Sequence, residues 1–195
     1  MFSCRDYKKV HVYLNLVNSQ FLYPVSVNCL EVFFSLVLVD LEGSEPEGAE
    51  WADGEAFNSE DVIFTIELLL GDETQSLSEA GNVQQWIASV EAVDDYTVTF
   101  NLTAPNPRFQ LDFFSVRIWG GINMMPEHVW ADKDPFTFKN FDLEAGYPLG
   151  TGPYVLVAAN ETEWVYDLNP DWWGAKTGVF KLPEPQRAIW TVTGN

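Results

Sequence analysis

The chain has 195 residues, of which 47% are hydrophobic and 15% aromatic, enough for the core of one large or two small domains and too apolar for a disordered protein. Its 29 acidic and 10 basic residues give a formal net charge of −19. Because this charge repels phosphate groups, binding to nucleic acid or to anionic lipid is not expected. An acidic surface keeps a protein soluble, and in salty surroundings counter-ions screen its self-repulsion.

The charge is not spread evenly along the chain. Residues 1–40 hold three basic and three acidic residues, so the whole excess comes from the 26 acids and 7 bases of residues 41–195. Both cysteines, Cys4 and Cys29, lie in the neutral part, while glycines and tryptophans begin only at Gly43 and Trp51. The cysteines lack zinc-site spacing. We therefore predict that residues 1–45 do not belong to the domain formed by residues 46–195.

Three interpretations of residues 1–45 compete. A secretory signal would use the basic start and the apolar stretch "CLEVFFSLVLV", but Glu31 interrupts that stretch and no small-residue cleavage site follows. A membrane span needs roughly 20 mainly apolar residues, and residues 12–30 contain Asn, Gln and Pro, so no span is expected. We favour the third interpretation, that the segment is foreign to the following domain, for instance through a wrong reading frame or start site.

The stretch "WADGEAFNSEDVIFTIELLL", residues 51–70, predicts a turn followed by a helix. Asp53-Gly54 is a turn signal, and Asn58 or Ser59 can cap a helix with acidic residues in its first turn, where the helix dipole favours them. An apolar stripe follows and ends near Gly71: Val62, Ile63, Ile66, Leu69 and Leu70. The acids are explained by this helix start, and they lack the register of a calcium loop, so no metal site is expected.

Further along, strands and helices alternate, which indicates a mixed α and β fold. Tyr96, Val98, Phe100 and Leu102 alternate with polar residues and predict a strand with one buried face in a hairpin that turns at Asp94-Asp95. "NPRFQLDFF" predicts a short helix, and "SVRIWGGINMMPEHVW" a strand, a glycine pair and a helix led by Pro126. Residues 154–168 predict a second hairpin, and "RAIWTVTGN" a final strand.

Five segments in this order resemble the extracellular solute-binding proteins of ABC importers, family 5, the class that includes dipeptide-, oligopeptide- and nickel-binding proteins. They are "EWADGEAFNSEDVIFTIELL", "VEAVDDYTVTFNLTAPNPRF", "MMPEHVW", "PLGTGPYVL" and "DLNPDWWG". The resemblance implies part of the first lobe of a two-lobed, type II periplasmic-binding-protein-like fold, truncated before the second lobe. It also implies a periplasmic or extracellular receptor that delivers a peptide or other small solute to a membrane permease, without catalysis and without a cofactor.

Within that resemblance, "VRIWGG" is the candidate ligand-binding segment. Arg117 can pair with a ligand carboxylate, Trp119 can stack on a ligand, and Gly120-Gly121 allows close approach of the main chain. A buried tryptophan beside an ordinary turn explains the same residues. The sequence leaves these two interpretations open.

Fewer residues of the sequence support an enzyme or a carbohydrate-binding module. The only histidines are His11 and His128. His11 lies in the segment 1–45 and His128 suits a helix surface or cap, so a Ser-His-Asp or Cys-His site is not expected. Two tryptophans beside carboxylates, Trp172-Trp173 with Asp167 and Asp171, would suit a glycoside hydrolase. Trp119, Trp164 and Trp172 would suit a carbohydrate-binding module.

Overall fold

The computed structural model describes residues 9–14, 34–36, 48–106, 108–114 and 121–191. The chain forms two compact units. The first unit contains residues 58–131 together with two strands from the N-terminal part of the chain. The second unit contains the described residues 48–57 and the residues from Asp132 onward. The expected boundary near residue 45 stays a prediction, since most of residues 1–45 lie outside the described residues.

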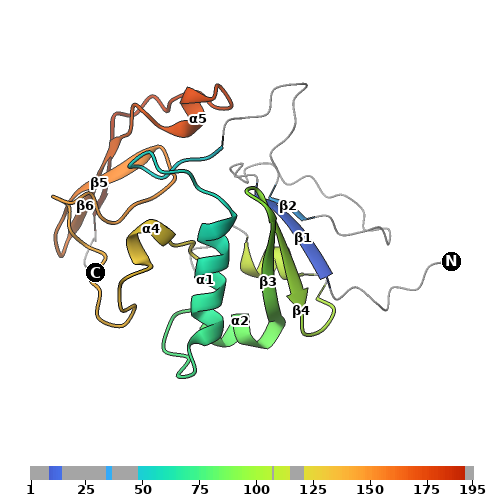
Figure 1. Ribbon diagram of the computed structural model, residues 1–195. Helices are drawn as coiled ribbons and strands as arrows, with labels where there is room; N and C mark the ends of the chain where they lie inside the picture. The colour runs from blue at the N-terminus through green and yellow to red at the C-terminus, as the bar shows by residue number, and fades with distance from the viewer. Residues whose placement is uncertain (1–8, 15–33, 37–47, 107, 115–120, 192–195) are drawn as a thin grey trace. The chain divides into compact units, whose positions relative to one another are not determined.

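The first unit is built on a four-stranded sheet with the order β2-β1-β4-β3 (Figure 1). The strands are β1 (Lys9–Leu14), β2 (Phe34–Leu36), β3 (Ile87–Asp94) and β4 (Thr97–Leu102). Strands β3 and β4 form the predicted hairpin, and β1 pairs with the other edge of β4 in antiparallel fashion. Strand β4 therefore lies in the interior of the sheet.

Helix α1 (Ser59–Gly71) packs against β3 and carries the predicted apolar stripe (Figure 1). Val62, Ile66 and Leu69 are buried, whereas Ile63 and Leu70 are only partly so. Asn58 is the N-cap, and the helix ends at Gly71 as expected. The stripe is thus confirmed, in a narrower form that matches the width of one helix face.

Shorter helices complete the first unit. Helix α2 (Ala80–Trp86) leads into β3, α3 (Phe109–Phe113) is the short helix predicted from "NPRFQLDFF", and α4 (Glu127–Trp130) follows Pro126. Aromatic rings join α3 to the sheet, with ring centroids 5.4 Å apart for Phe100 and Phe109 and 5.3 Å apart for Phe100 and Phe114. Such pairs add to the energy of area burial and make one core.

Strand β4 corrects one expectation. We predicted one buried face starting at Tyr96, but Tyr96 lies in the turn and is exposed, and the threonines Thr97 and Thr99 are buried together with Val98 and Phe100. The strand lies between β1 and β3, and a short side chain flanked by a strand on each side can be buried on either face. Alternating polarity predicts a one-sided strand only when one face meets water.

The second unit contains a three-stranded antiparallel sheet with the order β5-β6-β7. Strands β5 (Tyr154–Ala159) and β6 (Glu163–Leu168) form the second predicted hairpin, and β7 (Arg187–Thr191) is the predicted last strand. Helix α5 (Trp173–Lys176) lies between β6 and β7 in the sequence. Val165 is buried, and the other residues of these three strands are partly or fully exposed. The mixed α and β class is confirmed in both units.

In the ranges that the structure describes, no helix is both long enough and apolar enough to cross a membrane.

Candidate ligand-binding segment

Of the candidate ligand-binding residues, Gly121 lies in the described part of the chain. Arg117, Trp119 and Gly120 lie outside the described residues, so their ligand contacts stay a prediction. Gly121 is half-buried and begins the segment 121–126, which is neither helix nor strand and leads into α4.

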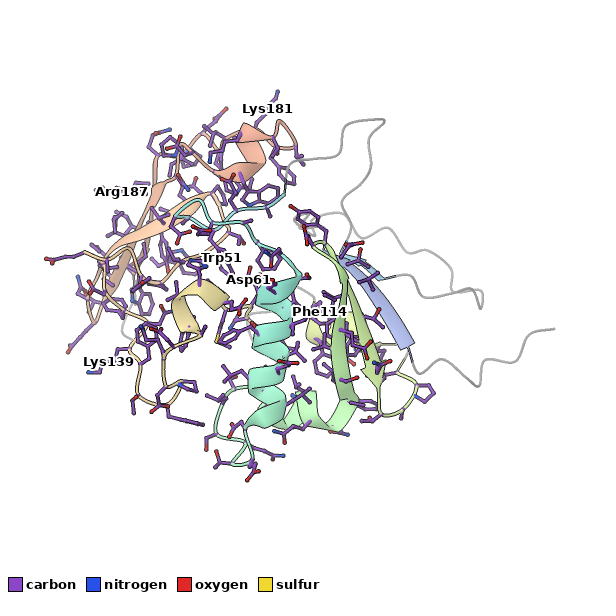
Figure 2. All side chains as sticks on the ribbon, viewed as in Figure 1. Trp51, Asp61, Phe114, Lys139, Lys181 and Arg187 are labelled. Atoms are coloured by element: carbon purple, nitrogen blue, oxygen red, sulfur yellow. The ribbon has the colours of Figure 1, made fainter. Side chains whose placement is uncertain are left out.

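Asp61 connects the start of α1 with the start of α4. Its Oδ2 accepts a hydrogen bond of 3.2 Å from the main-chain N of Asn58, and the Asn58 side chain accepts one from the main-chain N of Asp61, which together form a capping box. The Oδ1 of Asn58 also accepts a bond of 2.8 Å from the main-chain N of Glu60. Oδ1 of Asp61 accepts a further bond of 2.8 Å from the main-chain N of Glu127. Figure 2 shows Asp61 in the first turn of α1. Only 4% of its surface is exposed.

Thr65 makes the next connection, one turn further along α1. Its hydroxyl donates a 2.8 Å hydrogen bond to the carbonyl oxygen of Asp61 and accepts one of 2.9 Å from the main-chain N of Met125. Thr65 is fully buried. A buried main-chain donor that lacks an acceptor destabilises the folded state. The Thr65 hydroxyl therefore holds the main chain of Met125 beside this turn of α1.

A third connection lies at the other end of the segment. The main-chain N of Ile122 donates a 3.0 Å hydrogen bond to the carbonyl oxygen of Phe113 in α3. The segment is thus held at Ile122, Met125 and Glu127 by two different helices. Asn123, between these attachment points, is exposed.

The acids of the Trp-x-Asp-Gly stretch serve local structure. Oδ1 of Asp53 accepts a 3.2 Å hydrogen bond from the main-chain N of Glu55, and the carbonyl oxygen of Trp51 accepts one of 3.0 Å from Gly54. Gly54 has a φ of 93°, which an L-residue with a side chain rarely adopts. Across the described ranges, no group of three or more His, Cys, Asp or Glu side chains is arranged to hold a metal ion.

The paired tryptophans are structural in this fold. Trp172 and Trp173 are 9% and 5% exposed, and both indole N–H groups donate to the carbonyl oxygen of Thr151, at 2.9 and 2.7 Å. They tie α5 to the Gly-Thr-Gly-Pro turn instead of facing a sugar. Of the suggested stacking platforms, Trp164 is 42% exposed, and Trp119 lies outside the described residues.

Asp167, one of the carboxylates near these tryptophans, is bound by an arginine. Asp167 accepts two hydrogen bonds from Arg187, of 2.5 Å from Nε and 2.7 Å from Nη2, across the β6–β7 pair. The hydrogen bond from Arg187 lowers the pKa of Asp167, whereas a general acid needs a raised pKa. His128 is exposed on α4. The carbohydrate-binding alternative is therefore not favoured.

The comparison with known families agrees with this geometry. The family model of the bacterial extracellular solute-binding proteins, family 5 (middle region), matches residues 47–194. The chain belongs to this family.

Curated relatives extend the comparison. A protein of Brucella ovis, provisionally named an ABC transporter peptide-binding protein, is 34% identical over 135 residues. The matched region is 69% of this chain and 24% of that relative. A provisionally named binding protein of Brucella melitensis is 30% identical over 127 residues, 65% of this chain and 19% of its own. The chain thus spans about a quarter or less of the length of these relatives.

Solved structures show the same fold. A periplasmic oligopeptide-binding protein of an ABC transporter from Thermotoga maritima superimposes with a TM-score of 0.58 at 25% identity, over 76% of this chain and 26% of that one. The oligopeptide-binding protein AppA from Bacillus subtilis, solved with a nonapeptide, gives 0.56 at 20% identity over 75% of this chain and 27% of its own. The fold is therefore part of a type II periplasmic-binding-protein fold.

Sequence reasoning placed Asp61 in the first turn of the helix but missed its bonds to Asn58 and Glu127, and it missed Thr65 entirely. The distant bond partners lie 66 and 60 positions away, and local patterns carry no information at that separation. One signal was present in the sequence: Thr65 is the single polar residue in the apolar run of positions 62–66. A polar side chain on a buried helix face needs a hydrogen-bond partner, so its position could have marked it as an attachment point.

Proposed function

We propose that this chain is part of the substrate-capturing component of an ABC importer, which binds peptides or similar small solutes and delivers them to a membrane permease. The observation that carries the proposal is the family match over residues 47–194. The names of the Brucella and Thermotoga proteins support peptides as the ligand class. We place the protein in the periplasm or outside the cell, in keeping with the family description, and its contact with the permease associates it with the membrane.

The proposed ligand contacts are those of the segment that ends at Gly121. Arg117 pairs with a carboxylate of the ligand, Trp119 stacks on it, and Gly120 and Gly121 let the main chain approach it. Arg117→Ala is expected to weaken binding of a peptide with a free carboxylate by more than about tenfold, the loss of one charge-assisted contact. An unchanged dissociation constant would remove Arg117 from the site.

A thermal-shift screen tests the ligand class. A ligand that binds only the folded state raises the unfolding temperature. The screen compares two hexapeptides of opposite charge, (Lys-Ala)3 and (Glu-Ala)3, with mannohexaose, since a Thermotoga protein of this kind, 26% identical to this chain, was solved with mannohexaose bound. A rise in the unfolding temperature with a peptide supports the proposal. A rise with mannohexaose alone would contradict it and indicate a sugar as the ligand class.

We further propose that the chain catalyses no reaction on its ligand. The lowered pKa of Asp167 beside Arg187 supports this. Incubation of the protein with each hexapeptide and with a chromogenic glycoside is expected to leave all of them intact. Release of chromophore or of peptide fragments would contradict the proposal.

A further inference from the structure

Strand β7 forms one edge of the three-stranded sheet in the second unit. It pairs with β6 on one side, and the described residues place no strand on its other side. Ile189 and Trp190 on this strand are 54% and 68% exposed. Because successive residues of a strand point to opposite faces, each face of this edge carries an uncovered apolar side chain. An exposed apolar edge strand is a surface on which another strand can pair.

The ladder with β6 determines which main-chain groups of β7 point to the free side. The main-chain N of Leu168 donates a 2.9 Å hydrogen bond to the carbonyl oxygen of Gln186, and hydrogen-bonded pairs alternate with other pairs along an antiparallel ladder. The alternation puts Ala188 and Trp190 in hydrogen-bonded pairs with β6. The residues that turn their N–H and C=O groups to the free side are Arg187, Ile189 and Thr191.

Charge favours β7 as a place where two copies of the chain can meet. Two copies with a net charge of −19 each repel one another over most of their acidic surface. Strand β7 holds none of the 29 acidic residues, and its Arg187 is bound by Asp167 of the same chain. Self-repulsion is therefore weak at this edge.

The opposite edge of the sheet, β5, is less suited to pairing. It is also uncharged, but its register with β6 shifts between Leu156 and Ala158. A bulge or irregularity of this kind disrupts an edge and hinders the addition of another strand. The structure thus distinguishes a regular edge from an irregular one.

The sequence of β7 is complementary to itself. In a closed pair of identical chains a two-fold axis relates the strands, and the residues that point outward face one another as hydrogen-bonded pairs. The register that pairs the whole strand places Ile189 opposite Ile189 of the second copy. Arg187 then lies opposite Thr191 of the second copy, so like charges do not face each other.

The same register matches side chains on both faces of the sheet. On one face, the large Trp190 lies opposite the small Ala188 of the second copy, which continues the row that Trp190 forms with Trp164 in its own chain. On the other face, the two Ile189 side chains meet and continue the row that Ile189 forms with the buried Val165. Such cross-strand neighbours stabilise a sheet.

We propose that β7 is a homodimer interface, at which two copies of this chain join their three-stranded sheets into one continuous sheet. The inference goes beyond the proposed function and does not depend on the ligand class. A pair of five-residue strands buries less surface than the roughly 1,600 Å² of a standard interface. We therefore expect a weak dimer, with a dissociation constant of about 10 to 100 µM.

Sedimentation equilibrium of the full chain, at about 5 to 500 µM, measures this association. We expect monomer and dimer, with a dissociation constant at least about threefold lower in 0.5 M NaCl than in 0.05 M NaCl, because salt screens the repulsion between the acidic copies. A chain that stays monomeric at both salt concentrations would overturn the inference. Open-ended oligomers would do so as well, since they require two different surfaces.

A pair of lysine variants identifies the edge. Ile189→Lys puts two like charges opposite each other at the two-fold axis and should weaken the dimer by more than about tenfold. Val157→Lys makes the same kind of change at a partly exposed residue of β5 and should change the dissociation constant by less than about twofold. Equal effects of the two substitutions would contradict an interface at β7.

A disulfide test gives a positive signal that loss of stability cannot imitate. Opposite residues of a hydrogen-bonded antiparallel pair have Cα atoms about 5.5 Å apart, within the range that a disulfide spans. In a Cys4→Ser, Cys29→Ser background, Ile189→Cys should form a covalent dimer with oxidised glutathione at least about ten times faster than Val157→Cys. Equal rates for the two variants would show that β7 does not lie against its copy.

Discussion

The carboxylate of Asp61 and the main-chain N of Glu127 are joined by a 2.8 Å hydrogen bond across 66 positions of sequence. The same carboxylate also accepts the N–H of Asn58, at 3.2 Å. One buried side chain therefore completes the starts of two helices, α1 and α4. The free N–H groups at a helix start need such acceptors.

Asp61→Ala should therefore destabilise the first unit. It leaves the N–H groups of Asn58 and Glu127 without this acceptor, and we expect a loss of about 2 kcal/mol in the free energy of unfolding, the combined effect of a lost cap and a lost buried hydrogen bond. Urea unfolding followed by circular dichroism measures it. Glu60→Ala, at the exposed neighbour in the same helix turn, is the control and should cost less than about 0.5 kcal/mol. Equal losses for the two variants would show that the bridge contributes nothing.

Local signals explain which parts of the fold were predictable. The helix start at Asn58 or Ser59, the apolar stripe of α1 and the hairpin around Asp94-Asp95 all depend on residues within a few positions of one another, and each was predicted. The partners of Asp61 and Thr65 are set by the packing of α4 and its approach on α1, which is decided by the fold as a whole. Periodicity cannot supply such a contact.

The paired tryptophans show a second reason why the rest could not be predicted. In the sequence, Trp172-Trp173 beside acids equally suits a sugar platform and a buried cluster. Their orientation depends on the carbonyl oxygen of Thr151, 21 and 22 positions away, which accepts both indole N–H groups. Residue type alone does not tell whether an aromatic ring faces solvent.

Gly174 should not tolerate a side chain. A Cβ atom placed there would lie 2.6 Å from the ring of Trp172. Because Trp172 is held by its hydrogen bond and by stacking on Phe180, with centroids 5.5 Å apart, the ring cannot move away freely. We expect Gly174→Ala to cost about 1 to 3 kcal/mol, as overpacking does. Thermal unfolding followed by tryptophan fluorescence measures the change.

Gly152→Ala is the matched control for Gly174→Ala. A Cβ atom at Gly152 would meet nothing within 4 Å, so the substitution should change the free energy of unfolding by less than about 0.5 kcal/mol. If Gly174→Ala were as stable as Gly152→Ala, the arrangement of Trp172 over Gly174 would be wrong.

The ion pair of Asp167 and Arg187 should give a pH-dependent contribution to the second unit. The hydrogen bond from Arg187 lowers the pKa of Asp167 below its ordinary value of 3.8. A carboxyl group with a lowered folded-state pKa stabilises the folded state above its unfolded pKa, and that contribution is lost as the pH falls through the lowered value. The pair should thus contribute at pH 7 and lose its contribution below about pH 4.

A double-mutant cycle isolates this contribution. Unfolding of the unmodified protein, Asp167→Asn, Arg187→Gln and the double variant gives the coupling between the two side chains. We expect a small favourable coupling at pH 7, since both groups are partly exposed, and its decline toward zero under acid conditions. A coupling that stays constant from pH 7 into the acid range would mean that Asp167 does not titrate as described.

Salt should stabilise the chain as a whole. The net charge of −19 repels itself in the folded state, and counter-ions screen this repulsion. We expect the free energy of unfolding to rise by about 1 kcal/mol between low salt and 0.5 M NaCl, a shift of roughly 3 °C in Tm. Charge screening is nearly complete at that ionic strength, because the Debye length has fallen to about 4 Å.

A rise in the free energy of unfolding that appears only above 0.5 M NaCl would instead indicate exclusion of salt from the protein surface. Differential scanning calorimetry over a series of NaCl concentrations distinguishes the two, and a Tm that falls or stays constant up to 0.5 M would show that the acidic residues do not strain the fold.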